Sequence, residues 1–268
     1  MTLESRLDEA NRLRPIFERA VSELERFLSS VTKGYIKKPI VVNRFGHEAI
    51  RFADPSATDA ILLKFARVVS LNRAMLLLMD NGFVQEQCIV QRSLEETNED
   101  ILFYAISETE AVRSDRFRKH LEEFWKEDYK NPNDPVGTRV RRGFTRKGIG
   151  PFLNRIFGQP NPSLADDVHH AIFSMYSGFT HGAAPQIFEL YDFEKNTFHT
   201  NGLLGTNRHI DYVIDGANSV YRSIQSACCL SKAFGSNKLL ATALEIERSF
   251  VQGVGVEKLI KETTKEYL

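Results

Sequence analysis

The sequence lacks features that would place it in several large classes of protein. It has no net charge, because 35 Lys and Arg residues balance 35 Asp and Glu residues. A neutral chain is not a general polyanion binder, so any contact with nucleic acid must come from a local basic patch. The most apolar stretch, residues 60–79, contains Lys64, Arg67 and Arg73, which exclude it as a membrane span.

Cysteine is also scarce. The chain has three cysteines, Cys88, Cys228 and Cys229, and none of them forms a C-x-x-C pair. This spacing argues against a structural zinc site built from cysteine, and an odd count without a disulfide framework indicates a reducing compartment. The first residues are charged and contain no apolar core of a signal peptide. We therefore expect a cytoplasmic protein.

The common catalytic and cofactor motifs are missing as well. No P-loop, G-x-G-x-x-G loop, G-x-S-x-G elbow or H-E-x-x-H zinc motif occurs. The Glu-x-x-His pairs of di-iron bundles are also absent. We therefore expect no cofactor and no metal ion, and the motifs leave open whether the protein is an enzyme.

Helical periodicity is the main feature that is present. Apolar residues recur at steps of three and four, which predicts long helices at 3–31, 57–80, 83–108, 114–129, 163–181, 207–233 and 236–250. Short helices are expected at 151–157 and 255–266, and a small β-hairpin near 187–200. Residues 40–42 suit either a short strand or an anchored loop. The prediction is a mostly all-α, multi-helix bundle forming a single domain over residues 1–268.

A basic loop interrupts the helical pattern. Proline-rich breaks at 131–135 and 159–162 bound an excursion over residues 131–162. Residues 139–147 within it contain no acidic residue and five basic residues around Phe144: Arg139, Arg141, Arg142, Arg146 and Lys147. Such side chains bind phosphate backbones, which makes RNA a candidate partner through residues 139–147. The alternative is an ordinary solvated loop.

One predicted helix carries a polar stripe. Its members recur at steps of three and four: Asp167, His170, Ser174, Ser177 and His181. Two imidazoles beside hydroxyls and a carboxylate suit acid–base chemistry, although a solvated helix face is the alternative. We expect the opposite side to face the core, with Val168, Ala171, Ile172, Met175 and Phe179. Gly178 within this helix indicates close approach of another backbone or a ligand.

A second polar group lies on the helix predicted at 83–108. Arg92, Glu96 and Glu99 share one stripe, and Glu95 flanks it. A functional interpretation places Glu95 or Glu99 beside His181, where a carboxylate would orient the imidazole ring. Charged groups on a solvated surface are the alternative.

Two short motifs carry a family resemblance. The R-S-x-x-E segment at Arg92 and the Y-S-x-x-x-H-G segment from Tyr176 to His181 resemble an uncharacterised family of bacterial all-helical proteins, over about residues 60–232. More distantly, the chain is similar to the HEPN superfamily, which includes ribonucleases of toxin–antitoxin and phage-defence systems. The usual HEPN signature is an Arg, a polar residue and then four to six residues to a His. Counting back from His181, this sequence has Met175 and Ser174 where that Arg would lie.

The sequence supports two hypotheses of function. The first is a non-enzymatic module that binds a protein partner or forms a homodimer, in a bacterial defence or stress system that the resemblance implies. The second is a metal-independent ribonuclease, with His181 as acid–base, Arg92 as phosphate-binding cation and Glu95 as the group that orients His181. Binding residues in either case are predicted at His170, Tyr176, Ser177, Glu99 and the basic loop.

Overall fold

The computed structural model describes residues 3–35, 37–109, 114–131, 133–134, 136–140, 146, 148–156 and 161–255, without the side chains of 109, 162–166, 168 and 169. Within these residues the chain forms nine helices and two small antiparallel hairpins. The predicted mostly helical bundle is therefore confirmed. No helix in these ranges combines the length and the hydropathy that crossing a membrane would need.

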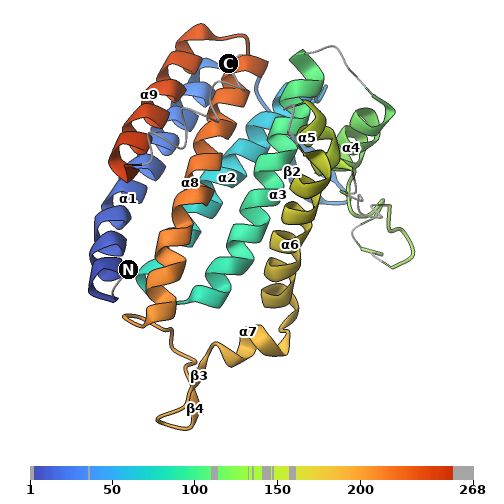
Figure 1. Ribbon diagram of the computed structural model, residues 1–268. Coiled ribbons are helices and arrows are strands. Elements are labelled where there is room, and N and C mark those ends of the chain that lie inside the picture. Colours follow the sequence, from blue (N-terminus) through green and yellow to red (C-terminus); the bar gives the residue numbers. More distant parts are fainter. Residues whose placement is uncertain are drawn as a thin grey trace.

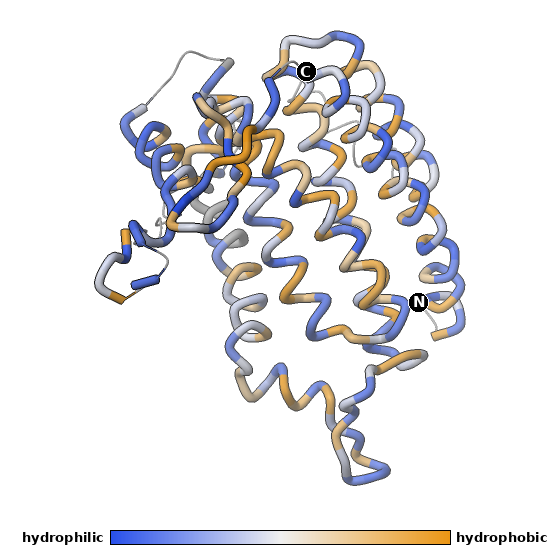
Figure 2. The backbone as a smooth tube through the Cα atoms, turned by 180° about the vertical axis from the view of Figure 1, so that it is seen from behind, coloured by the Kyte–Doolittle hydropathy of each residue, from blue (hydrophilic) through white to orange (hydrophobic). Residues whose placement is uncertain are grey.

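Three helices form the centre of the bundle: α2 (Ala57–Asp80), α3 (Val84–Thr109) and α8 (Asn207–Ala233). Two others, α1 (Leu3–Gly34) and α9 (Asn237–Val254), cover one side, and α6 (Pro162–His181) packs along α3 on the other (Figure 1). Each long helix alternates hydrophobic and hydrophilic residues along its length (Figure 2), as expected when one face packs inward. The bounds of the predicted long helices agree with these, apart from shifts at helix ends.

Three shorter helices and two hairpins complete the fold of the described residues. They are α4 (Asp115–Trp125), α5 (Ile149–Ile156) and α7 (Ala184–Phe188), with two hairpins, β1 (Ile40–Arg44) with β2 (His47–Arg51) and β3 (Tyr191–Asp192) with β4 (Thr197–Phe198). The hairpin predicted near 187–200 is confirmed, although α7 takes its first residues. Residues 40–42 belong to a strand, and the helix expected at 255–266 lies outside the described residues.

The turn between α2 and α3 depends on a glycine. Gly82 follows the C-cap residue Asn81 with a φ of 71°, in the left-handed region that the Asn-Gly pair predicts. A Cβ atom at position 82 would lie 2.8 Å from the Cα of Leu204. The segment before α8 therefore packs directly on the backbone of this turn, where only glycine fits.

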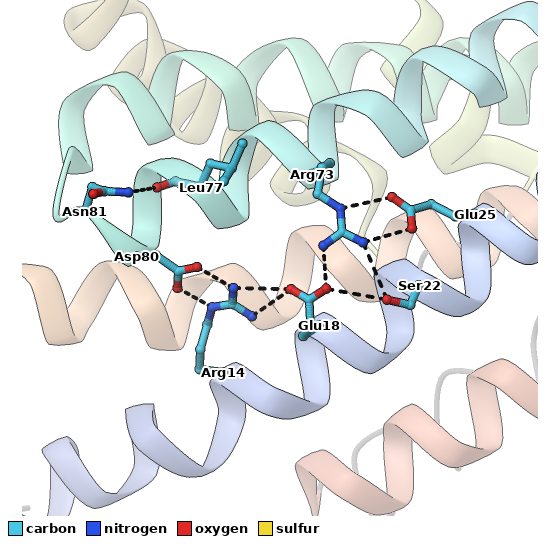
Figure 3. Close-up of polar contacts among 8 residues, drawn as sticks. All are labelled: Arg14, Glu18, Ser22, Glu25, Arg73, Leu77, Asp80 and Asn81. Atoms are coloured by element: carbon cyan, nitrogen blue, oxygen red, sulfur yellow. Dashed lines mark hydrogen bonds and ion pairs between the residues drawn. The ribbon is translucent and has the colours of Figure 1, made fainter.

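A ladder of ion pairs joins α1 to α2 (Figure 3). Arg14 binds Asp80 at 2.5 Å and Glu18 at 3.3 Å, while Arg73 bridges Glu18 and Glu25, the latter at 2.9 Å. These groups are partly exposed, so each pair contributes little stability by itself. Pro15 lies inside α1, which continues through it as one helix.

The interface of α3 with α2 and α8 is polar and fully buried. Asn98 accepts a hydrogen bond from Ser226 at 2.8 Å, and Asn72 donates to Ser223 at 2.9 Å. Gln91 donates to Ser219 at 3.3 Å. Buried polar groups must be paired, so these bonds fix the register of the three helices relative to one another.

The predicted orientation of α6 is wrong in part. Phe179 is buried as expected, but Ala171, Ile172 and Met175 are exposed. Phe179 packs its ring edge-on against Tyr212 of α8, at 6.0 Å between centroids, and this contact sets which side of α6 faces inward. The apolar residues of α6 span more of its circumference than the bundle covers, so part of them stays at the surface.

Candidate functional site

A cavity lies where α3, α4, α5 and α6 meet. It has a volume of about 790 Å³, within the usual range of small-molecule sites. We call it the α3–α6 cavity, and its lining residues are Arg92, Glu96, Glu99, Arg116, Arg146, Gly148, Gly150, Pro151, His170 and Phe173. Four of the predicted site residues are therefore brought together here: Arg92, Glu99, Arg146 and His170.

Arg92 extends from α3 into the wall of the cavity. Its Nε atom donates to Glu96 at 3.2 Å, in the i,i+4 ion pair that the sequence indicates. Its Nη1 atom is buried and makes no hydrogen bond with any described residue. A buried donor without a partner costs about 1–3 kcal/mol of folding stability.

Arg146 comes from the basic loop but points into the protein. It binds Glu99 at 2.8 Å and also forms an ion pair with Asp100, both on α3. Burial alone would lower the pKa of Arg146, but the two carboxylates outweigh it and raise that pKa. This arginine therefore fastens the loop to α3 at the edge of the cavity.

Arg116 reaches the same cavity from α4. Its Nη1 atom donates to the carbonyl of Gly148 at 3.1 Å. Gly148 has a φ of 94°, and a Cβ atom there would lie 2.6 Å from the Arg116 guanidinium. The glycine thus leaves space for the arginine, which is exposed on the cavity wall.

A buried charged cluster lies behind the cavity, around Asp100. Burial would raise the pKa of Asp100, but Lys64, at 2.7 Å, and Arg146 hold it below its usual range. The Nε2 atom of His120 lies 3.6 Å from the same carboxylate, and its Nδ1 atom is hydrogen-bonded to the Tyr104 hydroxyl at 2.6 Å. Burial lowers the pKa of His120 to about 4. The imidazole is therefore neutral at pH 7.

Glu95 faces α8 rather than the cavity. It is 3% exposed, lies 2.7 Å from the Arg222 guanidinium and accepts a hydrogen bond from Ser219 at 3.3 Å. Tyr176 of α6 lies on the same side. Burial raises the pKa of Tyr176, and the negative charge of Glu95 raises it further. Glu95 and Tyr176 are therefore close enough to interact electrostatically, and neither lines the α3–α6 cavity.

His181 lies at the other end of α6 from the cavity. Eleven residues separate it from His170, which corresponds to roughly 16 Å along a helix axis. His181 is exposed, whereas Ser177, between the two, is half-buried. The structure does not bring His181 together with Arg92 and Glu95, as was predicted. The helices α3 and α6 are antiparallel, and Arg92 faces the first half of α6, where His170 lies.

Of the other basic residues of the loop, the structure describes Arg139. Arg139 is exposed and lies on a short turn, in an isolated bridge with Tyr129. Arg141, Arg142 and Lys147 lie outside the described residues. The prediction that the loop binds RNA therefore stays a prediction for those three side chains.

Several residues of this region are not apparent from the sequence. Arg116 belongs to a helix that reads as a solvated surface with paired charges, and His120 lies on the same helix. Lys64 interrupts the apolar pattern of α2, which is the one local signal that a buried charge was needed there. Among the described side chains, no group of three or more His, Cys, Asp or Glu is placed to hold a metal ion.

No protein-family model, curated protein or solved structure matches this chain. Its function has to be argued from the α3–α6 cavity and the surrounding surface.

Proposed function

We propose that the protein is a helical binding module that takes a phosphate-bearing ligand, with single-stranded RNA as the first candidate, into the α3–α6 cavity. One observation carries this proposal. Arg92, Arg116, Arg146 and His170 lie far apart in the sequence, on three helices and a loop, yet they line one cavity. Guanidinium groups bind phosphate oxygens through paired, charge-assisted hydrogen bonds.

The charges in the cavity favour an anion moderately. Three arginines face two carboxylates, Glu96 and Glu99, which leaves one excess positive charge. Arg146 is already bound by Glu99 and Asp100, so Arg116, which is exposed on the cavity wall, is the group that would contact a phosphate. With so few contacts, we expect weak binding that depends strongly on salt.

The apolar part of the wall suits the rest of a nucleotide. Phe173 and Pro151 line the cavity together with the charged groups. Bases stack on aromatic side chains at a gain of about 1–3 kcal/mol each, without much preference for sequence. A cavity of this size accepts an unpaired nucleotide, which favours single strands over duplexes.

Fluorescence anisotropy with a labelled oligouridine tests the proposal. Arg116→Ala is expected to weaken binding, whereas Arg118→Ala, on the exposed side of α4 and paired with Asp115, is the matched control. If Arg116 contacts a phosphate, its loss lowers the slope of log K against log salt by about 0.7. Equal effects of the two variants, or no binding by the wild type at low salt, would contradict the proposal.

A second candidate function is metal-independent RNA cleavage, with His170 in the place first predicted for His181. The observation that favours it is that His170 shares the cavity with Arg92, whereas His181 does not. An imidazole beside a phosphate-binding arginine can act as acid or base. Cleavage that persists in EDTA, is lost in His170→Ala and survives in His181→Ala is the expected result. Loss of cleavage only in His181→Ala would refute the assignment.

The biological setting rests on the sequence alone. The resemblance to a bacterial all-helical family, and more distantly to the HEPN superfamily, supports a defence or stress role as a proposal. The cysteine usage supports a cytoplasmic location in the same way.

A further inference from the structure

The charged residues of α6 lie in its first turns, and the rest of α6 and all of α7 contain none. Residues 168–188 contain no Asp, Glu, Lys or Arg. Several large apolar side chains of this segment are nevertheless exposed, among them Met175 at 45% and Phe188 at 63%. Exposed helical surfaces of monomers normally carry charged residues, so an uncharged and apolar exposed face indicates an interface.

These residues form one continuous patch. Met175 lies on the exposed side of α6, and Gly182 follows the last residue of that helix, at the end that leads to α7. Ile187 of α7 continues that side, because its Cδ1 atom lies 3.6 Å from where a Gly182 Cβ would be. We call this the α6–α7 patch, defined by Ala171, Ile172, Ser174, Met175, Ile187 and Phe188, all of which are exposed.

We propose that the α6–α7 patch binds the same patch of a second copy of this chain, as a two-fold symmetric dimer. A two-fold interface places each group near its own copy, so a charged patch would tend to bring like charges together. The α6–α7 patch has no charge to repel its copy, and the whole chain has no net charge. A partner chosen by charge would instead require charged groups on this face.

The size of the patch sets the strength of the dimer. The patch has six residues, and even all the exposed residues from 170 to 188 number only twelve. A standard stable interface uses about 20–30 residues from each partner. The dimer is therefore weak, and it forms and dissociates as the concentration changes.

Sedimentation velocity of the full chain, from about 5 µM to about 1 mM, tests this proposal over the range of weak association. Wild type shifts from monomer toward dimer as concentration rises. Met175→Glu raises the dissociation constant by at least about tenfold, because two carboxylates then meet in the contact. Leu7→Glu is the control, since Leu7 is 43% exposed and α1 lies on the opposite side of the bundle (Figures 1 and 2).

A wild type that stays monomeric throughout overturns the proposal, as does an equal shift in Met175→Glu and Leu7→Glu. Cross-linking gives a second measurement that needs no charged substitution. Under mild oxidation, Met175→Cys forms a disulfide-linked dimer in excess of wild type, and Leu7→Cys does not. The same yield in Met175→Cys and Leu7→Cys contradicts the assignment of the patch.

Discussion

The buried histidine behind the cavity makes stability depend on pH. His120 is 6% exposed, packed against the rings of Phe103 and Tyr104, and burial lowers its pKa from 6.5 to about 4. Below pH 6.5 the unfolded chain takes up a proton at this imidazole, whereas the folded protein does so only near pH 4. Stability is therefore complete above pH 6.5 and is lost as the pH falls toward 4.

The size of this effect follows from the two pKa values. A pKa lowered from 6.5 to about 4 corresponds to about 3 kcal/mol once both states are protonated. At pH 4.5 the loss reaches about 2.5 kcal/mol, and at pH 5.5 about 1.4 kcal/mol. For a chain of this size, the pH 4.5 loss lowers Tm by about 5–10 °C.

Chemical denaturation of wild type and His120→Asn at pH 7, 5.5 and 4.5 tests this reasoning. Asparagine keeps a polar group near Nδ1 that can bond the Tyr104 hydroxyl, but it does not titrate. The variant is less stable at pH 7 because packing is lost, and its stability then falls less on acidification, so the two curves converge. Parallel pH dependence in wild type and His120→Asn would refute the account of the buried neutral imidazole.

Three further predictions concern the packing of the bundle. Gly82→Ala should lower the free energy of unfolding, measured with urea, by at least about 3 kcal/mol, because the new Cβ meets the backbone of Leu204 and φ is positive. A decrease below about 1 kcal/mol would contradict this close approach. Asn98→Leu should lower the free energy of unfolding by about 2 kcal/mol, because the Ser226 hydroxyl loses its hydrogen-bond acceptor. An unchanged midpoint of urea unfolding would argue against that hydrogen bond. Arg73→Ala, in the exposed ladder, should cost about 1 kcal/mol or less in the same assay, and a larger cost would show that the ladder is stronger than its exposure implies.

The helices could be predicted because their signals are local. Apolar residues at helical spacing, the Asn81-Gly82 stop and the turn before β4 each depend on a few neighbouring residues. Gly178 indicates close approach of a backbone or ligand, but the group beside it is the Gln186 side chain, 2.6 Å from where a Cβ would lie. The sequence could not show that this neighbour comes from α7.

The candidate site was less predictable because it depends on how helices pair. Arg92 and His170 were both singled out, but the sequence favoured His181 as the partner of Arg92. Which turn of α6 meets Arg92 is set by the antiparallel packing of α3 and α6, and that is not a local property. The exposure of Met175 could not be predicted for a similar reason. An apolar pattern indicates which face of a helix is hydrophobic, but not whether another part of the same chain covers that face.

Hydrogen exchange of the protein with and without a saturating oligouridine tests most directly whether the α3–α6 cavity binds a phosphate-bearing ligand. We predict slower exchange in residues 148–156 and in α4, around Arg116, with no change in α1 and α9. Protection confined to α1 and α9, or no protection at saturation, would contradict the claim.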